Sequence, residues 1–179
     1  DILHRCLTTG IYRTEGVLPS ISPSMDIQVS SNFERAVFDA YGRDGKAVAQ
    51  LMDDLKATGA FTVSQGALQA LREVFDSGCV SEKETSATIS ATLAASAELI
   101  CPHTAVGVAV AEDHMGTNPM VTLATAHPAK FPDAVQGATG LRPPLPPRMA
   151  DLFDRPERVT RMTNDRAALQ ALILERTGA

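Results

Sequence analysis

The 179-residue chain has few of the features that mark a nucleic-acid or membrane protein. It has no tryptophan, 4% aromatic residues, and a net charge of −5, with no basic run that could support a nucleic-acid partner. No stretch approaches the roughly eighteen apolar residues of a membrane span, and no signal peptide is recognisable. The three cysteines are odd in number and form no CxxC pair, which favours reduced thiols. We therefore expect a soluble, cytoplasmic protein with no membrane partner.

Short motifs that define several enzyme classes are also missing. The sequence contains no GxGxxG and no P-loop, so it offers no recognised loop for a nucleotide or cofactor phosphate. It has no GxSxG turn of a serine hydrolase. Cys101 and His103, and likewise Asp113 and His114, lack the spacing of HExxH or CxxC metal sites. We therefore expect no metal site.

Apolar residues make up 44% of the chain, enough for a core, and most of them recur with a helical period. The stretch 43–100 reads as an all-helical unit. Three short strands are predicted, over 25–29, 120–124 and 159–162. The predicted helices cover residues 1–9, 33–41, 44–58, 64–78, 81–99, 104–111, a short stretch ended by Gly137 and Gly140, and a last helix capped by Asn164.

The stretch Met120–Asp133, MVTLATAHPAKFPD, carries the most chemistry. Its apolar start predicts the strand, and Thr125, His127 and Lys130 follow the strand end closely. Two prolines in this stretch suit the first turns of following helices. The ends of strands in open α/β sheets are where ligands bind, so we expect these polar side chains at a ligand-binding rim.

Three strings, in the same order as in a known family, give the chain a resemblance to threonine synthases. They are SPSMDIQVSSNFER (22–35), PHTAVG (102–107) and ATAHPAKFPDAV (124–135). The resemblance implies the α/β fold type II of pyridoxal-phosphate (PLP) enzymes, similar to tryptophan synthase β, with this C-terminal part helix-rich and poor in strands. It also implies three segments: 1–42 from the enzyme core, 43–100 as a helical insertion or subdomain, and 101–179 as the C-terminal part of the cofactor lobe.

The resemblance assigns cofactor contact to Thr125, whose hydroxyl would meet the pyridine nitrogen of PLP. The alternative is a strand threonine bonded to backbone. No catalytic residue is expected within this chain, because the family's Schiff-base lysine and phosphate loop lie upstream. Lys130 beside a histidine is therefore expected to be a solvent-exposed lysine at a helix start rather than the Schiff-base residue.

Four further residues are expected near substrate or cofactor. His103 and Thr104 open the PHTAVG helix, whose N-terminus suits a phosphate or carboxylate; alternatively, one of them simply caps the helix. Many relatives have aspartate where this chain has Cys101, which weakens a role for a carboxylate there. Asp26 and Asn32 have a supporting role or serve only the local structure, in which a capping box from Ser31 to Glu34 would begin the next helix.

The resemblance also implies a reaction. The full enzyme would be a carbon–oxygen lyase of threonine biosynthesis that uses PLP to convert O-phospho-L-homoserine and water to L-threonine and phosphate. This chain alone is expected to be inactive, with the missing N-terminal half as its partner. Two alternatives stay open: another fold type II PLP enzyme, such as a threonine dehydratase, and a non-enzymatic helical module that binds partners through the proline-rich LRPPLPPRM (141–149).

Overall fold

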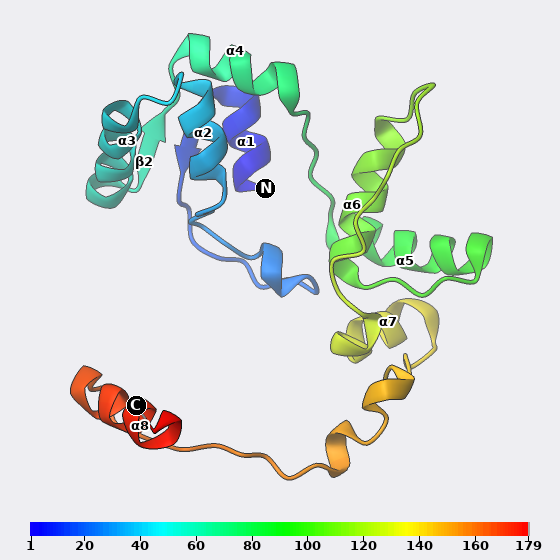
Figure 1. Cartoon of the computed structure of the whole chain (residues 1–179). Coiled ribbons are helices and arrows are strands. Elements are labelled where there is room, and N and C mark those ends of the chain that lie inside the picture. The colour runs from blue at the N-terminus through cyan, green and yellow to red at the C-terminus, as the bar shows by residue number, and fades with distance from the viewer. Residues whose placement is uncertain (179) are drawn as a thin grey trace. The chain divides into compact units, whose positions relative to one another are not determined.

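The computed structural model describes residues 1–178, which form two units that are described separately, 1–144 and the residues from Leu145 on. Helices dominate both (Figure 1). The first unit contains α1 (Ile2–Thr9), β1 (Ile11–Arg13), η1 (Pro23–Met25), α2 (Phe33–Ala40), α3 (Gly45–Thr58), β2 (Ala60–Thr62), α4 (Gln65–Val74), α5 (Glu82–Ser96), α6 (Pro102–Asp113), η2 (Pro128–Lys130) and α7 (Pro132–Thr139). The second contains η3 (Pro147–Met149), η4 (Leu152–Asp154) and α8 (Arg166–Thr177).

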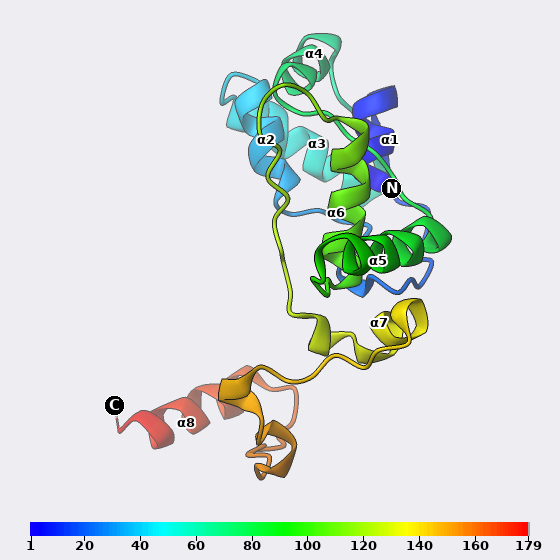
Figure 2. The same cartoon turned by 90° about the vertical axis from the view of Figure 1, so that its right-hand side faces the viewer.

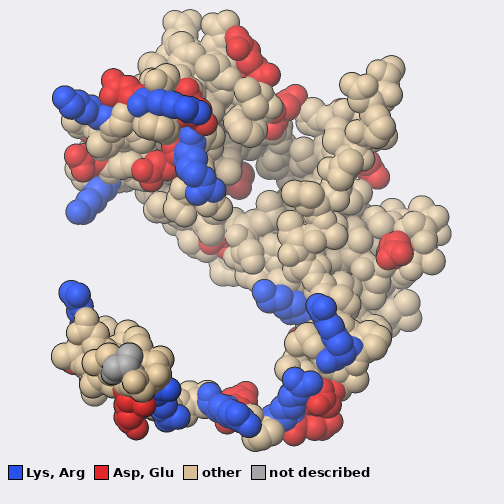
Figure 3. Space-filling view, viewed as in Figure 1, with Lys and Arg blue, Asp and Glu red and all other residues tan. Residues whose placement is uncertain are grey.

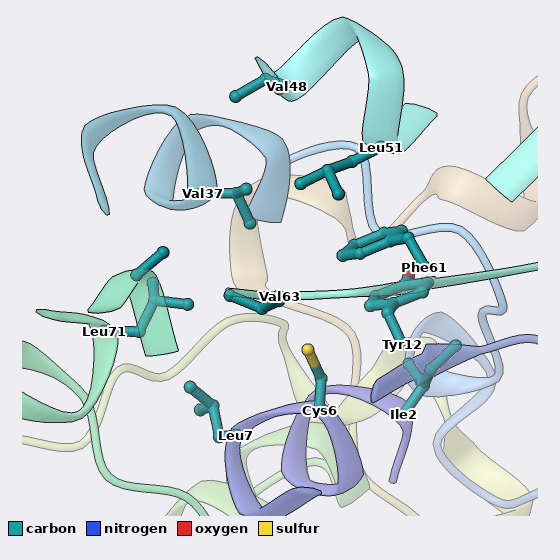
Figure 4. Packing of buried hydrophobic residues seen from close by; sticks show 11 residues of the cluster. Ile2, Cys6, Leu7, Tyr12, Val37, Val48, Leu51, Phe61, Val63 and Leu71 are labelled. Atoms are coloured by element: carbon teal, nitrogen blue, oxygen red, sulfur yellow. The ribbon is translucent and has the colours of Figure 1, made fainter. Parts of the chain in front are cut away.

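The N-terminal core is built around a two-stranded ribbon. Gly10 ends α1 in the left-handed conformation (φ 79°), where glycine carries no steric penalty, and the chain turns directly into β1. β1 pairs antiparallel with β2, with Tyr12 opposite Phe61. The two rings stack with their centroids 4.9 Å apart. Figure 4 shows them among buried side chains from α1, α2, α3 and α4.

This core corrects one expectation. Residues 43–100 are not all-helical, because Ala60–Thr62 forms β2. A strand this short has little periodicity of its own, and β1, about fifty residues earlier in the chain, supplies its hydrogen-bonding partner. The same core includes Val37 before the predicted boundary at 42/43 and Val48 after it. The division into 1–42, 43–100 and 101–179 stays a prediction.

The helices α5, α6 and α7 form a second packed group in the first unit. α5 contacts both of the other helices, and two views show it crossing α6 with α7 at its side (Figure 1, Figure 2). Ile89 of α5 and Val135 of α7 are completely buried. Ser90 donates a hydrogen bond to the Ala138 carbonyl (2.6 Å), which ties α5 to α7. A capping box begins α5: the hydroxyl of Ser81 accepts the Glu84 N–H, and the Glu84 carboxylate accepts the Ser81 N–H.

The three predicted strands are wrong. Residues 25–29, 120–124 and 159–162 form no strand in the described chain. A strand requires a neighbour for its backbone groups, and β1 and β2 bond only to each other in the described sheet. The segment around Thr122 lies against α6 instead: a Cβ added to Gly107 would come within 3.1 Å of the Thr122 methyl group.

Several helix starts also differ from expectation. α2 has Asn32 at its N-cap without a side-chain cap bond, so no capping box forms from Ser31. α8 is capped by Asp165, whose carboxylate accepts the Ala168 N–H (2.6 Å), and not by Asn164. Asp and Asn suit the N-cap position about equally, so the residue types alone could not show which of the two neighbours caps the helix. The prolines behave as expected: Pro128 and Pro132 occupy first helical positions.

The second unit has little interior of its own. The side chains of η3, η4 and α8 include no fully buried residue. Leu169, Ile173 and Leu174 of α8 are each about half exposed.

None of the helices in residues 1–178 is long and apolar enough to cross a membrane. On the face in Figure 3, basic and acidic side chains are interspersed and form no single charged patch.

Candidate functional site

The start of α6 is the best-covered helix end among the three family-like strings. Pro102 occupies the first position, and Cys101 is the N-cap. Its sulfur accepts the Thr104 N–H (3.5 Å) and lies 3.2 Å from the Thr104 hydroxyl. Cys101 and Thr104 are buried, as is Ala105 in the next turn. The alternative that His103 or Thr104 caps this helix is therefore wrong, and His103 is free to point elsewhere.

His103 connects all three strings. Its Nε2 accepts a hydrogen bond from the backbone N–H of Ser24 (3.0 Å), in the first string. Its ring lies against Phe131, in the third string, with centroids 4.5 Å apart and a tilt of 50°. Its Nδ1 is covered and has no hydrogen-bond partner within the described residues. Segments separated by some 80 residues thus meet at one imidazole.

The surroundings of His103 favour its neutral form. Burial lowers the pKa of this imidazole below 6.5, because charge is poorly solvated there. The positive charge of Lys130 lowers the pKa further, and the negative charge of Asp26 acts in the opposite direction. A neutral imidazole has one donor nitrogen and one acceptor nitrogen, which matches the acceptor role of Nε2 toward Ser24.

Asp26 stabilises the loop on which Ser24 lies. Its carboxylate accepts two hydrogen bonds from Ser20, one from the N–H and one from the hydroxyl, both 2.7 Å long. Later in the loop, the Ser30 N–H donates a hydrogen bond to the Tyr12 hydroxyl (2.8 Å), which anchors the end of the loop to the core. Asp26 also lines a cavity of about 390 Å³. The charged side chains around that cavity are Asp1, Arg5, Glu15, Asp26 and Glu82.

Two of the predicted residues make no hydrogen bond with this cluster within the described residues. Asn32 is exposed at the start of α2, and its side-chain oxygen accepts a hydrogen bond from the Arg35 guanidinium (3.1 Å). Thr125 is exposed in the segment between α6 and η2, and its hydroxyl makes no hydrogen bond within residues 1–178. Since no strand forms there, Thr125 is not the backbone-bonded strand threonine that was the alternative.

The polar groups after Thr125 are engaged locally. His127 Nδ1 accepts the Ala129 N–H (3.1 Å) and so caps η2. Lys130 is exposed, as expected, but it is the last residue of η2 and not a helix start; its Nζ lies 5.9 Å from the centre of the Phe131 ring. The structure thus groups His103 with Asp26 and Lys130, and leaves Asn32 outside.

Sequence reasoning missed two participants in this cluster. Ser24 was visible as a polar residue of the first string, but it acts through its backbone N–H, which every residue except proline has, so nothing in its side chain indicated the bond to His103. Phe131 contributes its ring, which packs against the imidazole at a tilt. Its position beside Lys130 in the third string was visible, but an aromatic residue next to a helix start is usually interpreted as packing.

The chain closely resembles threonine synthases in sequence. The family model described as "Threonine synthase, C-terminal" matches residues 104–173. Threonine synthase of Pseudomonas aeruginosa is 49% identical over 176 residues, which are 97% of this chain and 38% of that protein. The Saccharomyces cerevisiae enzyme is 39% identical over 157 residues, 77% of this chain and 30% of that protein. The chain spans less than two fifths of the length of these curated relatives.

Solved structures agree with the sequence comparison. The PLP-bound threonine synthase of Brucella melitensis superposes with a TM-score of 0.91 and 48% identity, covering 100% of this chain and 39% of that chain. The yeast threonine synthase superposes with a TM-score of 0.82 and 31% identity, covering 99% of this chain and 40% of that chain. These structures confirm the predicted fold class, a helix-rich part of the α/β fold type II. The chain belongs to the threonine synthase family and matches the C-terminal part of its members.

Proposed function

We propose that this chain is the C-terminal part of a PLP-dependent threonine synthase that converts O-phospho-L-homoserine and water to L-threonine and phosphate. The observation that carries the proposal is the superposition of the whole chain on a PLP-bound threonine synthase with a TM-score of 0.91 at 48% identity. The convergence of the three family-like strings on His103 supports it, because segments that line one ligand site must meet in space. The reduced cysteines expected from the sequence favour a cytoplasmic enzyme.

The residues present fit the cofactor at one point. PLP supplies an electron-withdrawing ring that stabilises negative charge on the substrate carbon. Thr125 has an exposed hydroxyl with no partner in residues 1–178, so it is available to the pyridine nitrogen. A hydroxyl, unlike a carboxylate, leaves that nitrogen largely unprotonated and so moderates the ring's electron withdrawal. Thr125 is the residue that we propose contacts the cofactor.

The rest of the cofactor site is proposed to lie outside this chain. Lys130 is exposed at the end of η2, near His103 and Phe131. The lysine that holds PLP and the loop that holds its phosphate would come from the remaining part of the enzyme. Borohydride reduction of the intact protein with PLP, followed by peptide mass mapping, should place the cofactor outside residues 1–179. Specific labelling of Lys130 would contradict this assignment.

The activity is tested on the intact protein with two substrates in parallel. We expect PLP-dependent phosphate release from O-phospho-L-homoserine together with formation of threonine, and little 2-oxobutyrate from L-threonine. The reverse preference would favour the rival, a threonine dehydratase of the same fold. The isolated chain of residues 1–179 is the matched control and should be inactive with both substrates. A Thr125→Ala variant should lose activity and alter the absorbance of bound PLP, whereas Thr125→Ser should retain both.

A further inference from the structure

We infer that His103 is a positioning residue: in one fixed tautomer, it ties the loop that carries Ser24 and Asp26 to the start of α6 and to the segment that leads from Thr125 to Phe131. Its effect on catalysis rests on the proposed function, whereas its tautomer and its hydrogen bond do not.

The hydrogen bond to Ser24 determines the tautomer. A backbone N–H can only donate, so Nε2 of His103, 3.0 Å from the Ser24 nitrogen, must present its lone pair. In a neutral imidazole the proton is then on Nδ1. A second proton would place an Nε2–H against the Ser24 N–H, donor against donor, and the link would break. His103 can therefore hold the loop only while it is neutral.

The ring is also held in orientation. Phe131 packs against the ring with centroids 4.5 Å apart, and a flip of the ring would put a carbon where Nε2 now accepts the Ser24 N–H, so the hydrogen bond selects one ring orientation. Nδ1 is covered, without a partner in residues 1–178. A covered N–H without an acceptor is unfavourable, so the Ser24 hydrogen bond and the Phe131 contact must offset this cost. Because Nε2 and Nδ1 belong to one rigid ring, the hydrogen bond from Ser24 to Nε2 also fixes the direction in which the Nδ1–H points.

The charged groups near the ring are Asp26, from the loop, and Lys130, from η2. Burial and the charge of Lys130 lower the pKa of the imidazole, and the charge of Asp26 raises it. Asp26 is itself engaged with Ser20, which stabilises the loop from within. His103 fixes the same loop from outside. The segment after Thr125 is fixed through Phe131. One neutral imidazole therefore sets the relative position of two segments that we propose line the ligand site.

The test compares two replacements in the intact, PLP-loaded enzyme. His103→Phe keeps a ring against Phe131 but offers no acceptor to Ser24. His103→Gln removes the ring but keeps an acceptor oxygen within reach. We expect kcat/KM to fall by about ten- to hundredfold in His103→Phe and by clearly less in His103→Gln. His4→Gln is the matched control, because His4 forms a comparable side-chain hydrogen bond with Ser77 (3.0 Å) outside the cluster, and it should stay within about twofold of wild type.

Two readouts are independent of the proposed reaction. Nitrogen-15 NMR of histidine-labelled wild-type protein should show Nε2 of His103 unprotonated and Nδ1 protonated at neutral pH. The Ser24 amide signal should shift in His103→Phe and not in His4→Gln. A protonated Nε2, or an unchanged Ser24 amide, overturns the inference whatever the substrate is. Equal activity loss in folded His103→Phe and His103→Gln also overturns it, whereas absence of wild-type activity on O-phospho-L-homoserine would count only against the proposed function.

Discussion

The two ends of α6 differ in burial and in the segments that they contact. Its N-terminal end is buried: Cys101 and Ala105 have no exposed surface, and His103 contacts two other segments. Its C-terminal end is exposed and contacts the linker between α4 and α5. There, the His114 Nε2 lies 3.0 Å from the Asp76 carboxylate. The buried end is the one where the predicted site residues gather.

The pKa values of the histidines at the two ends of α6 are shifted in opposite directions. Burial lowers the pKa of His103, as described above. The pKa of His114 is raised, chiefly by its hydrogen bond to the Val110 carbonyl (2.7 Å); burial opposes this, and the charges of Asp76 and Asp113 add to the rise. A helix C-terminus also favours a cation, and an N-terminus disfavours one. The sign of each pKa shift therefore follows from the surroundings, and the histidine whose neutral form is favoured is the one at the proposed site.

The largest difference between the two ends should appear when side-chain volume is added to each. Ala105→Val inserts two methyl groups at a position with no free space, which should cost about 1–3 kcal/mol of unfolding free energy. Ala111→Val makes the same change near the other end of the same helix, where the side chain is only partly buried, and should cost far less. Urea denaturation of the intact protein measures both. Equal losses would mean that the N-terminal end is not the better packed one.

A second prediction concerns the linker at the exposed end. A Cβ on Gly78 would come within 2.9 Å of a Val110 methyl group, and valine cannot easily rotate away because it is branched at Cβ. We expect Gly78→Ala to cost about 1 kcal/mol, since an exposed linker can yield. Gly66→Ala is the control: no atom lies within 4 Å of its added Cβ, and in a helix the change should be stabilising by about 0.5–1 kcal/mol. A thermal shift of the same sign in both variants would contradict the contact.

The smallest expected difference between the two ends of α6 is in how their histidines make the stability depend on pH. The two dependences have opposite signs. The folded-state pKa of His103 is lowered, so its contribution is complete above the ordinary value of 6.5 and is lost as pH falls below it. The folded-state pKa of His114 is raised, so its contribution is present below 6.5 and is lost as pH rises through the raised value. NMR titration of the two ring signals should therefore give midpoints on opposite sides of 6.5. Asp76→Asn should lower that of His114 and leave that of His103 unchanged.

The predictions that succeeded were local in character. α1 ends at Gly10 and α3 ends at Gly59, both left-handed glycines directly after a helical period. The α5 start was recognisable from Ser81 and Glu84, because the capping box lies within four residues. In such cases the residues that decide the structure are neighbours in the sequence, so a single chain contains the whole argument.

The predictions that failed required a partner from elsewhere. Met120–Ala124 has strand composition but no strand beside it in the described chain, whereas Ala60–Thr62 has little strand character and pairs with β1. For the site, the resemblance led to His103, Asp26 and the segment after Thr125. It did not reveal that Ser24 bonds to His103 through its backbone, since a hydrogen bond across 79 residues has no local signal.

The residues between η4 and α8 have a consequence for the lifetime of the polypeptide. Residues 155–165 are exposed and have no regular secondary structure, and they contain Arg158 and Arg161. A protease must draw an extended, accessible segment into its active site, and loops of this kind are the usual first point of cleavage. Arg155 is followed by Pro156, which protects that bond from trypsin-like enzymes, but the two later arginines have no such protection. Unless this stretch is covered, cleavage here would remove α8 and leave the His103 cluster intact.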